Sequence, residues 1–155
     1  MEHQEHGLAL GKLLANLQGI ELLARTYLYE RIDKASGEPL AAFQLNVPIG
    51  ASQAVNHFNN YDSLSTILRK YNDLNPHAKL DVETIVKLRD GIAHGRIFGE
   101  VEDESLRLIK FSKEKSGFVS VTYNEELNSE WFKRNITLTR QIAEQIHLNI
   151  MEVQK

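Results

Sequence analysis

Helical periodicity near the start of the chain constrains the fold more than any other feature of the sequence. From Leu10 to Ile32, apolar residues return every three or four positions, which is the spacing of one face of an α-helix. The residues on this face are Leu13, Leu14, Leu17, Ile20, Ala24, Tyr27 and Leu28. The pattern predicts one long amphipathic helix over 4–34, which needs other elements to cover its apolar face.

Two shorter helices are predicted in the middle of the chain. The segment Ser36-Gly37-Glu38-Pro39 should end the first helix, and 35–60 should form a long loop. Asp62 is expected to cap a brief helix that Asn75-Pro76 brings to an end. Asp81 is expected to cap a third helix, whose apolar residues repeat at helical spacing up to Gly95.

The last third of the chain predicts a β-hairpin followed by a fourth helix. The runs LRLIKF and GFVSVTY, over 106–123, are rich in β-branched or aromatic residues and flank a turn at Lys113 to Ser116. Asn128 or Ser129 should cap the final helix, which extends to the C-terminus. Its apolar stripe contains Trp131, Leu138, Ile142, Ile146, Ile150 and Val153. The expected fold is therefore mainly α, with four helices and a small hairpin before the last one.

Composition narrows the class of protein further. A chain of 155 residues, 42% of them hydrophobic, is expected to form one domain over 1–155. The net charge of −3 argues against a protein that coats nucleic acids through a broad basic field. The absence of cysteine excludes disulfides, thiolate zinc sites and cysteine nucleophiles. Because the sequence also has no signal-peptide pattern and no apolar run long enough for a membrane span, we expect a soluble, cytoplasmic protein.

The segment LRDGIAHGR, 88–96, contains the strongest candidate for chemistry. Arg89, Asp90 and His94 crowd around Gly91 and Gly95 at the predicted end of the third helix. Histidine titrates near neutral pH and can transfer a proton to or from a ribose hydroxyl, while a guanidinium binds phosphate oxygens in a bidentate fork. The acid between them can orient either side chain. This set of residues suits metal-independent cleavage of a phosphodiester.

The geometry of a straight helix limits what this segment does alone. His94 comes five positions after Arg89, so their side chains point about 140° apart and lie about 7.5 Å apart in height. The two glycines permit close approach of another backbone at Gly91 and a left-handed C-cap at Gly95. Two such helix ends that meet across a two-fold axis could pool their arginines and histidines, and we therefore expect a symmetric homodimer.

A structural interpretation of the same residues stands beside the functional one. A histidine followed by glycine is also an ordinary helix end, where a partly charged imidazole complements the helix dipole. A chain of this composition yields roughly one arginine–histidine pair at such a spacing by chance. The spacing alone does not separate the two interpretations.

Together with the order of the helices, Arg89, Asp90 and His94 resemble the HEPN family. Its members are small all-α domains whose motif is an arginine, a polar residue, three to five further residues and a histidine. The resemblance implies a four-helix up-and-down bundle, a homodimer whose two motifs line a shared cleft, and an endoribonuclease that needs no metal and no cofactor. Many members act in toxin–antitoxin, anti-phage or RNA-processing systems, so an RNA substrate and a cognate antitoxin or partner protein are implied.

A second function class remains open. Other members of the HEPN family bind nucleotides or have lost catalysis, which implies a non-catalytic dimeric module for a partner protein or nucleotide. An open, polar setting for Arg89 and His94 favours the enzyme, whereas pairing of both under apolar side chains favours the module.

Other candidate sites are weaker. His3, Glu5 and His6 could hold a metal, but a mobile polar start of the first helix explains them as well. The acidic run that contains Glu100, Glu102, Asp103 and Glu104 lacks the pattern of a calcium loop. We expect His57, His77 and His147 to be surface or boundary residues without a partner. No metal or cofactor is therefore predicted.

Overall fold

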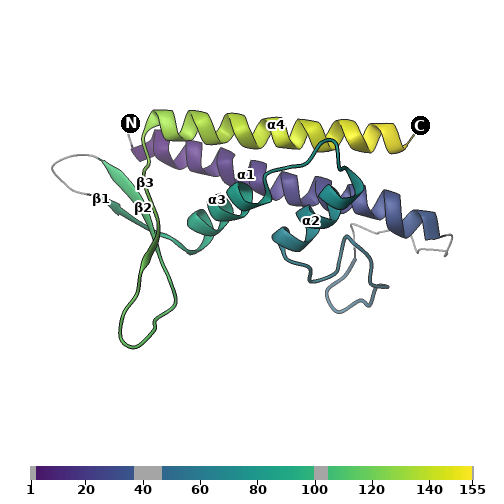
Figure 1. Ribbon diagram of the computed structural model, residues 1–155, viewed down its shortest axis with the longest axis horizontal. Coiled ribbons are helices and arrows are strands. Elements are labelled where there is room, and N and C mark those ends of the chain that lie inside the picture. Colours follow the sequence, from purple (N-terminus) through teal and green to yellow (C-terminus); the bar gives the residue numbers. More distant parts are fainter. Residues whose placement is uncertain (1–2, 37–46, 100–104, 155) are drawn as a thin grey trace. The chain divides into compact units, whose positions relative to one another are not determined.

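The computed structural model describes residues 3–36, 47–99 and 105–154, which form mainly helices and one small sheet (Figure 1). The α-helices among them are α1 (His3–Leu28), α2 (Leu64–Leu74), α3 (Val82–His94) and α4 (Ser129–Val153). The strands are β1 (Arg96–Gly99), β2 (Leu106–Phe111) and β3 (Val121–Glu126). The predicted mainly helical class, with four helices and β-structure before the last one, is confirmed.

Two compact units make up the chain. Unit 1 comprises Met1–Gln18 and Asp81–Gln141, and unit 2 comprises Gly19–Leu80 and Ile142–Lys155. Two of the three boundaries fall inside helices, because α1 and α4 each contribute one part to unit 1 and another to unit 2, and the third lies between Leu80 and Asp81, before α3. Most of the predicted acidic turn at 99–104 and part of the predicted loop, 37–46, lie outside the described residues.

In unit 1, the start of α1 packs against α4. The Nε2 atom of His6 lies 2.9 Å from the carbonyl oxygen of Leu127, and the His6 ring meets the Phe132 ring edge-on, with 6.0 Å between their centroids. The Nδ2 atom of Asn16 donates to Thr139 Oγ1 at 3.0 Å. His6 is buried, so the interpretation of this residue as part of a mobile polar start is wrong.

A three-stranded antiparallel sheet, in the order β1-β2-β3, replaces the predicted hairpin. Strand β2 pairs with β3 as expected, but β3 covers Val121–Glu126 instead of the predicted run that ended at Tyr123. Ser116 and Gly117 both have positive φ, which is the requirement of the tight turn that joins twisted hairpin strands. The extra strand, β1, has only four residues, too few to produce a recognisable alternation.

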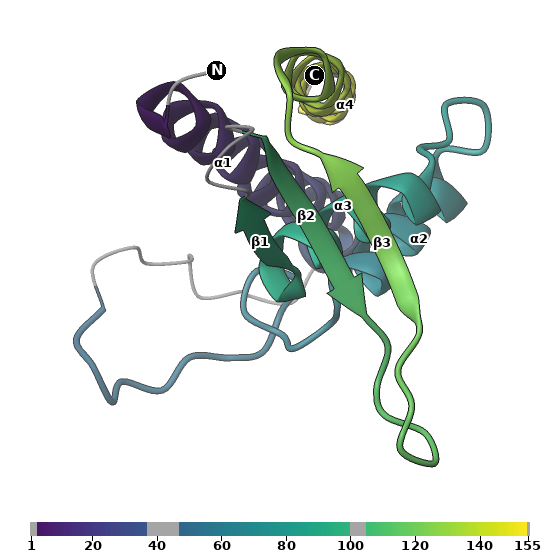
Figure 2. The same cartoon turned by 90° about the vertical axis from the view of Figure 1, so that its left-hand side faces the viewer.

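Helix α3 packs against the face of the sheet that carries Leu108 and Tyr123, and it lies behind the strands in Figure 2. Asp81 caps its start as predicted, since the side chain accepts from the backbone N–H of Thr84 at 3.1 Å. Ile85 and Leu88 are buried on this helix. The sheet therefore holds the end of α3, where the candidate residues lie.

Gly95 is required at the end of α3 for a steric reason and not for the predicted left-handed C-cap. Its φ is −77° and its ψ is 170°, an extended conformation that any residue can adopt. A β carbon at this position would lie 2.3 Å from the carbonyl oxygen of Gly91 and 2.7 Å from Leu108 Cδ1. The chain can turn from the helix into β1 over Leu108 only because this β carbon is absent.

Unit 2 contains the end of α1, where the predicted helix continues as a π-helical turn (Tyr29–Asp33) and a 3-10 turn (Lys34–Ser36). Asp33 at the end of the π turn accepts from the backbone N–H of His57 at 2.8 Å, and Asp33 Oδ1 lies 2.9 Å from His57 Nδ1. The expectation that His57 has no partner is wrong. Sequence periodicity could not reveal this pair because a π turn departs from the 3.6-residue repeat.

The N-cap of helix α2 in unit 2 is Ser63, one residue later than the predicted cap, Asp62. The side chain of Ser63 accepts from the backbone N–H of Thr66 at 3.3 Å, whereas Asp62 pairs with Lys70 at 2.7 Å. Asn75 ends the helix as predicted. The tyrosine rings of Tyr27 and Tyr71 meet at 4.9 Å between centroids in the core of this unit.

The predicted stripe on α4 is confirmed in its main part. Asn128 caps the helix through a 2.9 Å bond from the backbone N–H of Trp131 to its side chain. Four stripe residues are buried, namely Trp131, Ile142, Ile146 and Ile150, whereas Leu138 and Val153 are partly exposed. Within the described ranges, no helix has the length and apolar character needed to cross a membrane.

Substitution of Gly95 by alanine should destabilise the protein by about 1–3 kcal/mol, the usual cost of overpacking. The matched control is Gly11→Ala on α1, where an added β carbon meets no atom within 4 Å. That change should stabilise the protein by roughly 0.5–1 kcal/mol through helix propensity. Urea denaturation of both variants measures the two effects, and equal stability of the pair would contradict the steric role of Gly95.

Candidate functional site

The three candidate side chains lie at the C-terminal end of α3 in unit 1. Arg89 and Asp90 are partly exposed and His94 is exposed, so none is buried under apolar side chains. The helix is regular from Val82 to His94, which keeps the expected splay of Arg89 and His94 around its axis. The structure therefore places the residues on one helix end without directing them to a single point.

Asp90 is the centre of a small charge cluster. One of its oxygens lies 2.9 Å from Arg89 Nη1, and the other lies 3.5 Å from Lys110 Nζ on β2. The side chains of these three residues are 33%, 30% and 27% exposed, in the order Arg89, Asp90 and Lys110. Water screens such pairs, so they contribute little to stability. Two cations against one carboxylate leave the cluster with a net positive charge, as an anion site requires.

His94 is separate from this cluster. Its side chain is exposed, and it forms no hydrogen bond or ion pair with any other residue in the part of the chain that the structure describes. Among the described residues, Asp90 therefore contacts Arg89 and not His94, and its role as an orienter stays a prediction. A free imidazole at a helix C-terminus can accept or donate a proton without first breaking a native contact.

The other side of α3 is anchored by Tyr123. A β carbon added to Gly91 would lie 3.3 Å from the Tyr123 ring, and Lys87 Nζ lies 6.0 Å from the centroid of the same ring. Burial raises the pKa of the Tyr123 hydroxyl above its usual value, and the negative charge of Glu125 adds to this shift. The phenol thus stays protonated at neutral pH. What approaches Gly91 is a side chain of the same protomer, so the prediction that this glycine admits another backbone is wrong.

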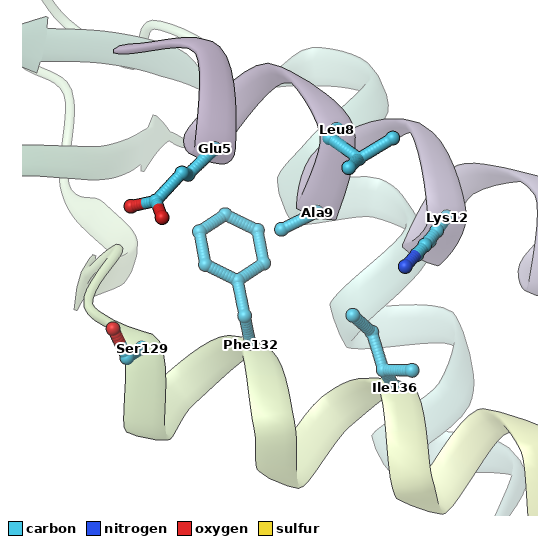
Figure 3. A pocket seen from close by; sticks show the side chains of 7 residues that line it. All are labelled: Glu5, Leu8, Ala9, Lys12, Ser129, Phe132 and Ile136. Atoms are coloured by element: carbon cyan, nitrogen blue, oxygen red, sulfur yellow. The ribbon is translucent and has the colours of Figure 1, made fainter. Parts of the chain in front are cut away.

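A separate hollow of about 330 Å³ lies between α1 and α4 within unit 1 (Figure 3). Its lining comprises Glu5, Leu8, Ala9, Lys12, Ser129, Phe132 and Ile136, with Phe132 and Ile136 directed from α4 toward α1. None of the candidate residues contributes to it. Most of its lining is apolar, and its two charged residues, Glu5 and Lys12, are exposed. We therefore assign no catalytic role to this hollow.

Comparison with family models, with curated proteins and with solved structures finds no match to this chain.

Sequence reasoning missed Lys110 as a member of the site. Nothing in the local pattern connects it to Asp90, twenty positions earlier, because the contact depends on β1 turning back over α3 and on the register of β2. A signal was available, since Lys110 alternates with Leu106 and Leu108 along the strand and therefore shares their face. An interior charge in a short strand calls for a partner of opposite sign.

Proposed function

We propose that this protein is a metal-independent endoribonuclease of HEPN type that cuts single-stranded RNA. The observation that carries the proposal is the end of α3, where an exposed His94 follows a net positive cluster of Arg89, Asp90 and Lys110. Such an arrangement pairs a proton-transfer group with a phosphate-binding group in an open, polar setting. The four-helix up-and-down topology of that family is part of the same proposal.

The reaction transfers the phosphodiester within the RNA. A ribose 2′-oxygen attacks the adjacent phosphorus, a new oxygen–phosphorus bond forms, and the bond to the 5′-oxygen of the next nucleotide breaks. One His94 removes the proton from the 2′-hydroxyl, and a second imidazole or water returns a proton to the leaving 5′-oxygen. Arg89 holds the nonbridging oxygens as their negative charge increases, and Asp90 limits the rotamers of Arg89.

The proposal includes a homodimer, which the geometry of the helix supports. Because Arg89 and His94 diverge by about 140° on a straight helix, a single protomer offers only one of them to a given phosphate. In a symmetric dimer, Arg89 of one copy and His94 of the other can face one phosphate. Exposed apolar side chains on α1, Leu8 at 64% and Leu14 at 42%, offer surface that a second copy can cover.

The alternative is a non-catalytic dimeric module for a partner protein or nucleotide. One observation favours it, because Asp90 already neutralises part of the charge of Arg89 within the protomer. Variants at His94 and Arg89 distinguish the two proposals, because a non-catalytic module has no RNA cleavage rate that a substitution could lower.

Replacement of His94 by alanine should slow the cleavage of labelled RNA on the order of 10²- to 10⁴-fold, since it removes one proton-transfer group. Arg89→Lys retains the positive charge but loses the bidentate guanidinium contact with phosphate, so its cleavage rate should also fall strongly. EDTA should leave the rate unchanged, and the products should end in 2′,3′-cyclic phosphate and 5′-hydroxyl groups. Full activity of His94→Ala, or a strict need for Mg²⁺, would show that the catalytic assignment is wrong.

Substitution of Asp90 by asparagine should separate binding from cleavage. The cluster loses its only negative charge, so RNA affinity should stay the same or rise, which fluorescence anisotropy can measure. Turnover should fall on the order of 10- to 100-fold, because Arg89 loses the contact that orients it. The control is Asp73→Asn, an exposed acid on α2. Loss of RNA affinity in Asp90→Asn would contradict this role.

The homodimer is tested by sedimentation velocity at micromolar concentrations. Leu8→Glu should shift the protein toward monomer and reduce cleavage together, since the composite site needs both copies. A wild-type chain that sediments as a monomer yet cleaves RNA would rule out the shared site.

A further inference from the structure

The strongest surface feature beyond the α3 site is the face of the sheet opposite α3, called the outer face here. It carries Arg96 and Phe98 from β1, Arg107, Ile109 and Phe111 from β2, and Glu126 from β3. All six side chains are partly or fully exposed, whereas Leu108 on the opposite face is 1% exposed. A sheet that shows aromatic rings to solvent on one whole face usually has a ligand for them.

Rings and guanidinium groups alternate on the outer face. Phe98 is 46% exposed and pairs across the strands with Arg107. Arg96 lies over the ring of Phe111, with 5.8 Å from its guanidinium carbon to the ring centroid. Since Phe98 lies opposite Arg107, and Phe111 lies four residues after Arg107 on β2, the two rings lie about 13 Å apart along the strand. Each ring thus has an arginine near it, as the cross-strand register partner for Phe98 and over the ring for Phe111.

We propose that the outer face is a stacking platform that binds a single-stranded stretch of RNA. A nucleobase stacks on an aromatic ring whatever its sequence, and an adjacent arginine neutralises the neighbouring phosphate. Two ring–arginine pairs along one sheet match two stacked bases of a single strand. The proposal rests on the proposed ribonuclease function and deepens it, because Arg96 lies only two residues after His94.

Charge favours a polyanion over an apolar protein partner. The outer face carries two arginines against one acid, Glu126, which is the register partner of Arg107 on β3. Arg107 uses its Nε to donate to Asn124 Oδ1 at 3.1 Å. A guanidinium has further N–H groups with which to bind phosphate. The hairpin that extends from β2 and β3 adds Lys113 and Lys115 with one acid, Glu114.

The test measures binding of the full chain to fluorescein-labelled oligouridylate and to oligothymidylate of about 12 nucleotides, by anisotropy. Thymidylate lacks the 2′-hydroxyl and cannot be cut, but it can stack, so both probes should bind. Phe98→Leu keeps the apolar bulk and removes the ring, and it should weaken both affinities roughly 5- to 150-fold. Arg107→Gln should reduce the slope of log affinity against log salt by about 0.7.

Matched controls are Tyr61→Leu and Arg69→Gln, which change an exposed ring and an exposed arginine of unit 2 and should alter binding less than about two-fold. His94→Ala should bind the probes like the wild type while its cleavage rate falls. Binding therefore tests the platform, and cleavage tests the catalytic site separately. Unchanged affinity in Phe98→Leu overturns the platform even if cleavage stands. Failure of the wild type to bind either probe up to about 100 µM also overturns the platform. In that case a protein partner is the remaining candidate ligand of the outer face.

Discussion

The contact between the end of α3 and the sheet is the constraint on which the rest of unit 1 depends. Gly95 passes so close to the carbonyl oxygen of Gly91 and to Leu108 that no side chain fits there. The helix can therefore lead into β1 without a loop, and β1 pairs directly with β2. This junction sets the position of His94 on one side of Gly95 and of Arg96 on the other. A longer connection would have left both side chains on a mobile segment.

Much of the helical part could be predicted from the sequence, because the signals are local. The caps at Asp81 and Asn128, and the buried stripe from Trp131 to Ile150, follow from capping chemistry and the 3.6-residue repeat. Arg89, Asp90 and His94 could be selected as candidates because they stand within six positions of one another, and their role as a site stays a prediction. The structure places them at the end of a regular helix, with Arg89 and Asp90 partly exposed and His94 exposed.

Most features that sequence reasoning missed depend on pairing between distant residues, whereas the cap of α2 at Ser63 is a local exception. Strand β1 is recognisable only through its partner, and Lys110 reaches Asp90 only once that pairing exists. The burial of His6 requires the carbonyl group of Leu127, more than a hundred positions away. Gly95 shows a related difficulty. Its identity was correctly treated as significant, but the reason is crowding by β2 and not a left-handed backbone. Composition and spacing contain no information about such contacts.

The π-helical turn at Tyr29–Asp33 has a consequence for how the sequence can change. A turn of this kind holds about one residue more than an α-helical turn, so every residue after it is displaced in phase around the helix axis. The displacement amounts to at most one residue's rotation, about 100°. Asp33 reaches His57 in this phase, at 2.9 Å. Loss of a single residue from this stretch would return the segment to regular α-helix and turn the carboxylate away, whereas most substitutions would preserve the phase. In related chains we therefore expect the number of residues in this turn to vary less than the identity of those residues.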